Sequence, residues 1–510
     1  MGNRHEKSEF WIQQYKEAVK HGRACLKKIK GIISAYNTNV DAIVRIKPEH
    51  IKFLEGLFPE ITVLEKVQKG LKNPPGVINT ISDFLIGLIC CMQTGTGAEW
   101  LIQSEDVFKW LLENFQPEVT TLGGQAGLVG NALAVLGVSK VYLHTTSLSP
   151  LQISTLPEFG IRIPVEENNH IVFKSPKEAI NPDDAQYVHF IFEFLNGTKI
   201  SVGKSEIIAP KDNRFIATFD PPNVNLEINQ TFITAIKSII DQIDMAMVAG
   251  FHLLKRQYPD GSTYEDRLQA GYNLILEWKK KLNPQIRIHL EQGSMQDALV
   301  RKGVLEALLP HIDGFGVNED ELLEILVTFG YEKIAEELKK EYNATRIFEG
   351  AKKIFDLFNI PRMTVHTRHF SLSLLRTQYG IKSKIEQLAM LLGAATAAMR
   401  AYTGKFLSLD EIDKFFQAID SQPRKNREYP KISQFGLEQI EDLAKLLSKI
   451  SRTSKEEFLK TGIASFSDFY VIFAVSLIVE DPKAIVGLGD SFTAGLLFGE
   501  SSNICSINSH

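Results

Sequence analysis

The chain has 510 residues, a net charge of −4 and a hydrophobic fraction of 44%, which suit a globular protein large enough for two domains. The slightly negative charge excludes the basic surface typical of nucleic-acid-binding proteins. The longest apolar run, residues 84–92, is too short to span a bilayer. The four cysteines have no spacing typical of a zinc site, and we expect a cytoplasmic protein.

Strand-like and helix-like segments alternate along most of the chain, which predicts an α/β fold with a central, mostly parallel sheet. Strands of this sheet are expected at residues 32–36, 142–145, 245–250, 286–291, 314–317 and 363–366.

Two stretches have a different character and suggest a second domain. Residues 42–120 have mostly helical patterns, and residues 165–215 have hairpin-like patterns, including a predicted hairpin of 188–194 with 199–202 around Asn196-Gly197. We therefore expect a small α/β lid domain inserted into a large domain. The large domain comprises residues 1–40, 121–164 and 216–510, and the lid comprises residues 41–120 and 165–215.

The most informative motif is Gly487-Leu488-Gly489-Asp490, which precedes an apolar, helix-like segment. Backbone N–H groups at a helix N-terminus bind anions, and glycine lets a phosphate approach them closely. An aspartate in the first turn is placed to take a proton from a substrate hydroxyl beside that phosphate. The motif indicates phosphoryl transfer, although its spacing alone is equally compatible with a tight connection capped by Asp490.

Two further segments have the composition of ligand-binding loops. Gly123-Gly124-Gln125 opens an apolar helix, where backbone amides can cradle a hydroxyl or phosphate, but no Gly-Lys-Ser/Thr follows as in a P-loop. Residues 37–41 follow the first strand, and ligands of α/β folds bind at the carboxyl ends of strands. Close helix packing and an Asx turn are the respective structural alternatives.

Acidic residues form another candidate site. Glu291 ends a predicted strand, and Asn318-Glu319-Asp320-Glu321 opens a predicted helix. Mg²⁺ prefers carboxylates and keeps several waters, so Glu291 and Glu321 are candidates for holding those waters. Asn318 followed by Glu321 is also a capping box, and the spacing leaves both roles open. Arg214 is a phosphate candidate by its guanidinium fork, with a surface ion pair as the alternative.

These motifs occur together and in order, and the chain resembles the ADP-dependent sugar kinases of the ribokinase-like superfamily over nearly its whole length. The motifs that carry the resemblance are Asn37 to Asp41, Gly123 to Gly127, His189 to Glu193, Ala209-Pro210-x-x-Asn213-Arg214, His289-x-Glu291, Asn318-x-x-Glu321, Val365-His366-Thr367 and Gly487-x-Gly489-Asp490. The similarity favours the phosphofructokinase branch, in particular that of methanogenic archaea.

The resemblance implies a ribokinase-like large domain with a smaller α/β lid, and transfer of the terminal phosphate of ADP to a sugar hydroxyl with Mg²⁺. It implies that Asp490 is the catalytic base and that Gly487, Leu488 and Gly489 stabilise the transferring phosphoryl group. The implied sugar contacts are Asn39, Asp41, Gly123, Gly124, Gln125 and His189. The implied nucleotide contacts are Arg214, Asn318, His366, Thr367 and Gly489, and the implied metal–water network comprises Glu291, Glu321 and Asp490.

The resemblance also implies the partners. We expect ADP, AMP and a hexose or hexose phosphate as ligands, and a monomer or small homo-oligomer without a nucleic-acid or membrane partner. Fructose 6-phosphate carries a phosphate that suits Lys or Arg, for which Arg214 and Lys174 are lid candidates. Glu99 stands where glucose-using family members carry a glutamate. We predict a phosphofructokinase, with a glucokinase or bifunctional enzyme as the alternative.

Two other classes of protein are compatible with parts of this pattern. An ATP-using ribokinase-type kinase shares the glycine–aspartate turn, but it should lack the long insertion after the first strand and the Asn213-Arg214-Phe215 segment. A non-catalytic sugar or nucleotide sensor would be free to lose Asp490, Glu291 or Glu321, and all three are present.

Overall fold

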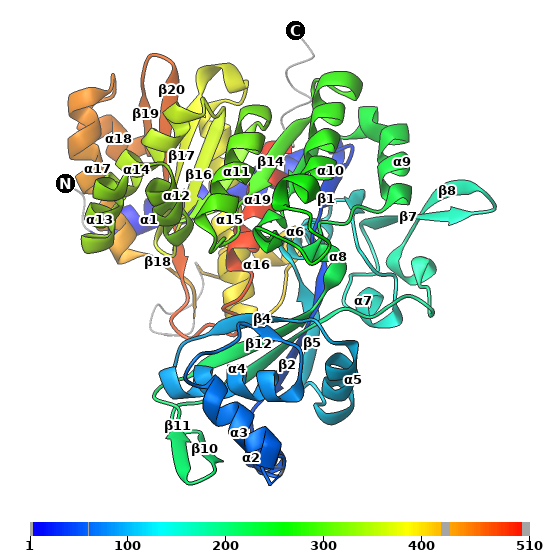
Figure 1. Cartoon of the computed structure of the whole chain (residues 1–510). Coiled ribbons are helices and arrows are strands. Elements are labelled where there is room, and N and C mark those ends of the chain that lie inside the picture. The colour runs from blue at the N-terminus through cyan, green and yellow to red at the C-terminus, as the bar shows by residue number, and fades with distance from the viewer. Residues whose placement is uncertain (1–3, 60, 420–428, 502–510) are drawn as a thin grey trace.

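The computed structural model describes residues 4–59, 61–419 and 429–501, and two separate sheets organise them (Figure 1). Each sheet has its own cluster of buried apolar side chains, so the chain contains two cores and two domains. No helix within these ranges combines the length and apolar character needed to cross a bilayer.

The large domain is built on an 11-stranded sheet. Its order is β19 (Ile463–Ser465), β20 (Phe469–Val475), β17 (Phe370–Arg376), β16 (Arg362–His366), β15 (Gly314–Asn318), β14 (Arg287–Glu291), β13 (Met245–Val248), β1 (Ile32–Ala35), β6 (Val141–Leu143), β7 (Ile161–Glu167) and β8 (His170–Lys174). Strands β16 to β7 are parallel, whereas β8, β17, β20 and β19 pair antiparallel at the two sides. The parallel strands are largely buried because helices cover both faces, as Figure 1 shows.

Helices of the large domain pack around this sheet, and most of them connect successive strands. They are α1 (Arg4–Cys25), α6 (Gln125–Leu136), α7 (Pro150–Ser154), α8 (Pro221–Val224), α9 (Gln230–Ile239), α10 (Tyr264–Leu276), α11 (Ala298–Leu308), α12 (Glu319–Thr328), α13 (Glu332–Lys340), α14 (Ala344–Leu357), α15 (Ser383–Thr403), α16 (Leu409–Ile419), α17 (Gln434–Ile450), α18 (Lys455–Thr461) and α19 (Leu488–Ser501). A short pair, β18 (Lys431–Ile432) with β21 (Leu477–Ile478), lies apart from the main sheet.

The small domain has a six-stranded mixed sheet in the order β3 (Val77–Ile78), β4 (Ala98–Ile102), β12 (Asn213–Phe219), β9 (Val188–Phe194), β2 (Asn39–Arg45) and β5 (Val119–Gly123). Its helices are α2 (Pro48–Glu55), α3 (Ile61–Gly70), α4 (Ile81–Thr94) and α5 (Glu105–Asn114). Aromatic rings fill its core: Phe84 of α4 lies 5.0 Å from Phe192 of β9, centroid to centroid. This core is independent of the large sheet, and the domain hangs below it in Figure 1.

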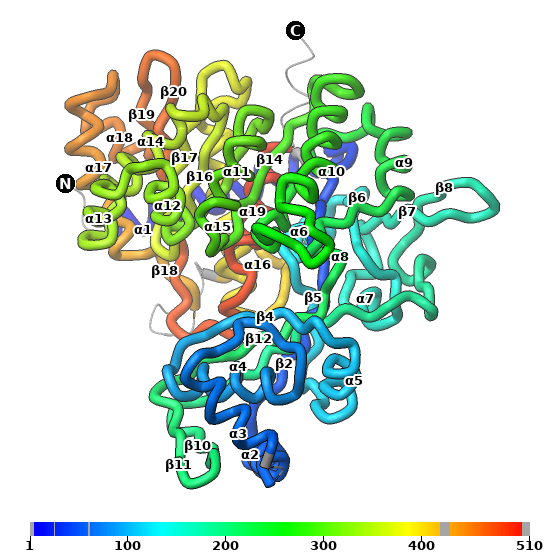
Figure 2. The backbone as a smooth tube through the Cα atoms, viewed as in Figure 1, coloured from blue at the N-terminus to red at the C-terminus, as the bar shows by residue number. Residues whose placement is uncertain are grey.

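The backbone trace of Figure 2 shows how the chain passes between the domains. Residues 36–38 lead from β1 of the large sheet directly into β2 of the small sheet, and Gly124 leads from β5 back into α6. The second passage runs from β8 to β9 and returns after β12. The residues between β1 and β2 and between β5 and α6 therefore lie where the two domains meet.

The α/β fold and the predicted parallel strands are confirmed, but one expected domain limit and one expected strand pairing differ from the structure. Residues 165–174 belong to β7 and β8 of the large sheet, so the second lid segment begins near β9 rather than at residue 165. The predicted hairpin of β9 with residues 199–202 is wrong, because β9 pairs with β12, whereas β10 (Lys199–Val202) pairs with β11 (Ser205–Ile208). Alternating apolar residues mark a strand but do not identify its partner.

The helix pair α15 and α19 forms the tightest helix contact in the large domain. A Cβ placed on Gly495 of α19 would lie 2.7 Å from the Cα of Gly393 on α15, so the two backbones touch. Every residue of α19 from Ser491 to Ser501 is buried. This close approach fixes the start of α19 relative to α15 and the sheet.

Candidate active site

The glycine–aspartate turn lies at the N-terminus of α19, as the sequence predicts. Gly487 has a φ of +70°, which favours glycine, and its carbonyl accepts bonds from the N–H (3.0 Å) and hydroxyl (2.6 Å) of Ser491. The helix begins at Leu488, and Asp490 stands in its first turn. The unpaired N–H groups of this turn form an anion-binding helix start.

A cavity of about 300 Å³ opens between the two domains in front of this turn. The predicted site residues that line it are Asn39, Asp41, Glu99, Gly124, Gln125, His189, Arg214 and Asp490. Strands β2, β4, β9 and β12 of the small sheet supply one wall, and α6, α15 and the start of α19 supply the other. The structure therefore gathers most of the predicted sugar-contacting residues around the predicted base.

The floor of this inter-domain cavity requires glycine. Asn39 Nδ2 donates to Asp41 Oδ1 (2.7 Å) on β2, and Gly123 is paired with Asn39 across the strands. A Cβ on Gly123 would lie 2.3 Å from Asn39 Nδ2 and from Asp41 Oδ1, so a side chain there would displace both polar groups. Gln125 Nε2 donates to the carbonyl of Gln292 (2.8 Å), which orients its amide. Gly123 is thus adjacent to the cavity without being among its lining residues.

His189 contributes positive charge to the small-domain wall. Its Nε2 donates to Asp220 Oδ2 (3.0 Å), and its Nδ1 lies 3.9 Å from Glu99 Oε1. Burial opposes the charged imidazolium, but the hydrogen bond to Asp220 and the nearby carboxylates outweigh it and raise the pKa of His189 to about 9. Glu99 also accepts a bond from the hydroxyl of Thr218 (2.7 Å). The cavity wall therefore pairs a cationic histidine with an acceptor-rich glutamate.

A second pocket, of about 490 Å³, lies on the other side of the turn and is formed by the large domain alone. Among its lining residues are the predicted nucleotide contacts Asn318, His366, Thr367 and Gly489, together with Leu488. Helix α15 gives it an apolar wall of four alanines, Ala394, Ala397, Ala398 and Ala401. Because Leu488 and Gly489 line this pocket while Asp490 lines the cavity between the domains, one turn of chain separates the two spaces.

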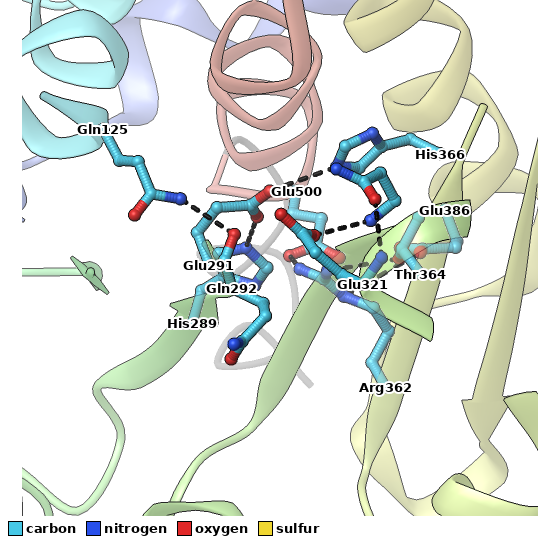
Figure 3. Close-up of polar contacts among 11 residues, drawn as sticks. Gln125, His289, Glu291, Gln292, Glu321, Arg362, Thr364, His366, Glu386 and Glu500 are labelled. Atoms are coloured by element: carbon cyan, nitrogen blue, oxygen red, sulfur yellow. Dashed lines mark hydrogen bonds and ion pairs between the residues drawn. The ribbon is translucent and has the colours of Figure 1, made fainter. Parts of the chain in front are cut away.

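Glu291 is held behind the turn by two histidines, as Figure 3 shows. His289 Nε2 donates to Glu291 Oε2 (2.9 Å), and His366 Nε2 donates to Glu291 Oε1 (3.1 Å). Burial favours the neutral carboxyl, but these two bonds prevail and lower the pKa of Glu291 to about 2. The carboxylate of Glu291 is therefore ionised and fixed in orientation.

The pKa values of the other two acidic candidates, Glu321 and Asp490, are raised instead of lowered. Burial, with the charges of Glu291 and Asp490, raises the pKa of Glu321 to about 8. Burial, with the charge of Glu291, raises the pKa of Asp490 to about 7. Glu321 also forms the capping box with Asn318: the N–H of Asn318 donates to Glu321 Oε2 (2.8 Å), and the N–H of Glu321 donates to Asn318 Oδ1 (2.9 Å). Three carboxyls thus share one small, water-poor region.

A buried cluster of charged side chains, Arg362, Glu386 and Glu500, lies between the large sheet and helices α15 and α19 (Figure 3). Arg362 of β16 donates from Nη2 to Glu500 Oε2 (2.9 Å) near the end of α19, and Glu386 accepts a bond from the hydroxyl of Ser373 (2.7 Å). Arg362 and both carboxyl side chains are completely buried. The cluster anchors the C-terminal end of the same helix whose first turn carries Asp490.

Some predicted placements are not realised. Lys174 lies on β8 of the large sheet, pairs with Glu167 and lines neither space, because the segment assigned to the lid belongs to the large sheet. Arg214 lines the inter-domain cavity but not the second pocket. Within the described ranges, no three His, Cys, Asp or Glu side chains are grouped as a direct metal site, so Glu291, Glu321 and Asp490 do not form a complete cage by themselves.

The sequence analysis missed three residues of the cavity region. His252 and Arg400 line the cavity, and Asp220 is the hydrogen-bond partner of His189. Arg400 had a signal in the sequence, since it is the only charged residue between Glu386 and Lys405 on an alanine-rich helix. His252 and Asp220 follow strand ends like many loop residues, and nothing in their spacing distinguishes them.

Comparison with known proteins gives a consistent result. The family model described as "ADP-specific Phosphofructokinase/Glucokinase conserved region" matches residues 30–499. The ADP-specific phosphofructokinase of Methanosarcina acetivorans is 29% identical over 491 residues, 96% of each chain.

Two solved structures are also similar. The last common ancestor of ADP-dependent phosphofructokinases from Methanosarcinales superposes with a TM-score of 0.84 at 30% identity, covering 96% of this chain and 98% of that one. An ADP-dependent kinase in complex with fructose 6-phosphate and ADPβS superposes with a TM-score of 0.79 at 28% identity, covering 99% of both chains. Since the family model spans most of the sequence and the predicted motifs fall around one turn, the chain belongs to the ADP-specific phosphofructokinase/glucokinase family.

Proposed function

We propose that this protein is an ADP-dependent 6-phosphofructokinase, which transfers the terminal phosphoryl group of ADP to fructose 6-phosphate and releases fructose 1,6-bisphosphate and AMP. One observation carries the proposal: a single turn, Gly487 to Asp490, presents its backbone to the 490 Å³ pocket and its aspartate to the inter-domain cavity. A donor in the first and an acceptor in the second would meet at this turn. The similar phosphofructokinase of Methanosarcina acetivorans and the similar kinase in complex with fructose 6-phosphate and ADPβS support the same chemistry.

The chemistry assigned to Asp490 agrees with its surroundings. A general base works best when its pKa lies near the working pH, and burial raises the pKa of Asp490 to about 7. The acceptor hydroxyl would give its proton to Asp490 as its oxygen bonds to phosphorus. The N–H groups at the start of α19 would receive the negative charge of the transferring group, and removing water from the closed cavity would strengthen that interaction.

Nucleotide binding is assigned to the 490 Å³ pocket. The alanine wall of α15 is flat and apolar and suits a purine ring, while Asn318, His366 and Thr367 offer polar partners at the end near the turn. Glu291, fixed by His289 and His366, lies beside the same end.

A divalent cation fits the acidic region between the pocket and the turn. Mg²⁺ is usually bound through one or two carboxylates, substrate phosphates and retained waters, so an incomplete protein cage is what such an ion requires. Glu291 and Glu321 would hold its waters, and Glu321 is electrostatically coupled to both Glu291 and Asp490. When bound, the ion supplies positive charge that offsets three neighbouring carboxyls and the phosphates of the donor.

Glucose is a second candidate acceptor, because Glu99 lines the inter-domain cavity. Its carboxylate already accepts a bond from Thr218, yet it has further acceptor capacity for sugar hydroxyls. Fructose 6-phosphate is favoured by two cationic side chains on the small-domain wall of the same cavity, Arg214 and His189, which suit a phosphate-bearing sugar.

A donor-by-acceptor assay tests the proposal, with ADP or ATP against fructose 6-phosphate or glucose, each with and without Mg²⁺. We expect turnover with ADP, fructose 6-phosphate and Mg²⁺ to exceed every other combination, with AMP as the second product. Asp490→Asn keeps the shape of the side chain and should lower kcat by roughly three orders of magnitude. ATP-only turnover, or an active Asp490→Asn variant, would contradict the proposal.

A further inference from the structure

Arg400 is an arginine beside the Gly487–Asp490 turn, and two of its guanidinium nitrogens have no hydrogen-bond partner in the part of the chain that the structure describes. It stands near the end of α15 and lines the inter-domain cavity together with Asp490. Its Nε and Nη1 atoms are fully buried, and neither has a hydrogen-bond partner among the described residues. A buried donor without an acceptor is costly, so such a group is usually completed by a ligand or water.

The position of the guanidinium is fixed by packing instead of by an ion pair. Its Cζ lies 4.1 Å from the centroid of the Phe406 ring, a cation–π distance. On the other side, a Cβ placed on Gly487 would lie 3.2 Å from Arg400 Nη2, so the guanidinium lies directly against the glycine turn. Asp490 and Asp41 attract its charge, but neither accepts a hydrogen bond from its Nε or Nη1 atom.

The position of the Arg400 guanidinium relative to Asp490 is also fixed. Helices α15 and α19 touch through Gly393 and Gly495, so Arg400 and Asp490 belong to one rigid unit of the large domain. Arg214, in contrast, is carried by β12 of the small sheet, and its distance from Asp490 depends on how the two domains sit. Of these two arginines, Arg400 is therefore the one held at a constant place beside the turn.

We propose that Arg400 is a catalytic residue that binds the phosphoryl group during its transfer, opposite the N–H groups of the Gly487–Asp490 turn. This role rests on the proposed kinase function. In the step, a bond forms between the acceptor hydroxyl oxygen and the terminal phosphorus of ADP. The bond from that phosphorus to the bridging oxygen breaks, AMP leaves with the bridging oxygen, and the hydroxyl proton passes to Asp490. Arg400 offsets the charge on the three non-bridging oxygens.

The reacting end of the acceptor explains why Arg400 is assigned to this phosphoryl group and not to the sugar's own phosphate. In fructose 6-phosphate the hydroxyl that reacts and the existing phosphate are at opposite ends of the sugar. A residue packed against the turn that carries the base lies at the reacting end. The phosphate of the sugar then lies toward the small-domain wall, where Arg214 and His189 are found.

Replacement of Arg400 tests the role, with Arg376→Gln as the matched control. Arg376 is stacked on Phe355 at 4.2 Å, much as Arg400 is stacked on Phe406, but it lies on β17 and lines neither space. We expect Arg400→Gln to lower kcat by about 10³-fold with fructose 6-phosphate and equally with glucose, with little change in KM or AMP affinity. Arg400→Lys should retain part of the rate, and added guanidinium should restore part of the rate of Arg400→Ala. Arg376→Gln should leave kcat unchanged.

A binding measurement separates this role from a structural one. AMP, fructose 6-phosphate and aluminium fluoride together mimic the transferring group, and Arg400→Gln should lose the extra thermal stabilisation that they give the wild type, while keeping that given by AMP alone. A kcat within threefold of wild type, or a loss confined to KM for fructose 6-phosphate, would overturn the role of Arg400. Absence of ADP-dependent turnover in the wild type would instead overturn the kinase function itself.

Discussion

Glu291 and Asp490 are both buried carboxyls of one site, yet their surroundings move their pKa values in opposite directions. Two histidine donors hold Glu291 in its ionised form, and its pKa falls to about 2. Burial and the nearby charge of Glu291 oppose the ionised form of Asp490, so its pKa rises to about 7. Environments that separate two carboxyls in this way divide their work: Glu291 stays a constant negative charge, and Asp490 is the carboxyl placed to exchange a proton in the proposed reaction.

The raised pKa of His189 should make the free energy of unfolding depend on pH. Its pKa is about 9 in the folded protein and about 6.5 when unfolded, so folding favours the protonated form. The contribution is complete below pH 6.5 and is lost as the pH rises through 9, with a total of roughly 3 kcal/mol. We expect the difference in unfolding free energy between wild type and His189→Gln, measured by urea denaturation, to shrink between pH 6.5 and 9.5.

His170→Gln provides the control for this titration, because His170 is an exposed residue of β8. Its stability difference from the wild type should stay flat over the same range. A His189→Gln difference that grows with pH would show that the imidazole is neutral in the folded state.

At the scale of elements, the pair α15 and α19 organises the site. Helix α19 carries Asp490 in its first turn and Glu500 near its end, where Arg362 fixes it to the sheet. Helix α15 carries Arg400 and the alanine wall of the 490 Å³ pocket. Their contact through Gly393 and Gly495 therefore sets the base, the proposed phosphoryl ligand and the pocket wall relative to one another.

Gly495→Ala should disturb this arrangement. The added methyl group would lie 2.7 Å from the Cα of Gly393 and from the carbonyl oxygen of Leu392, and backbone atoms cannot move aside like a flexible side chain. We expect a loss of roughly 1–3 kcal/mol in stability, measured by denaturation, together with a lower kcat. Gly271→Ala on α10 is the control: its methyl group would make ordinary contacts of 3.4 Å or more and should be neutral or slightly stabilising. Equal effects of the two changes would contradict the role of the helix contact.

The elements that the sequence predicted correctly are those with a local signal. The parallel strands are apolar runs near glycine or polar residues, and Gly487 with Asp490 marks the start of α19 within the chain itself. Strand pairing has no local signal, so β8 was placed in the wrong domain and β10 with the wrong partner. Asp220 escaped prediction for the same reason, because its link to His189 joins residues 31 positions apart.

Across the whole molecule, the two spaces of the site differ in which domains build them. The 490 Å³ pocket is lined by the large domain only, whereas both domains line the 300 Å³ cavity. A ligand in the 490 Å³ pocket makes no contact with the small domain. A ligand in the second contacts both sheets and links the domains.

Hydrogen exchange should report this difference. We expect AMP to slow amide exchange in α15 and at the start of α19 without affecting β2, β9 or β12. Fructose 6-phosphate should slow exchange in those three small-domain strands as well, because it bridges the domains. The β10–β11 arm lines neither space and serves as an internal reference. Protection of the small-domain strands by AMP alone would refute this division of the site.

The place of α19 in the chain has a consequence for how the protein becomes active during synthesis. Every strand of the large and small sheets precedes α19 in the chain. A ribosome therefore releases both sheets and the side chains that line the inter-domain cavity before it releases Asp490. Domains fold largely as their residues emerge, and the groove beside α15 and α6 stays open until α19 fills it. If Asp490 is the base, a nascent chain that already has the shape of a binding protein cannot transfer phosphate, and catalysis begins only when α19 is inserted.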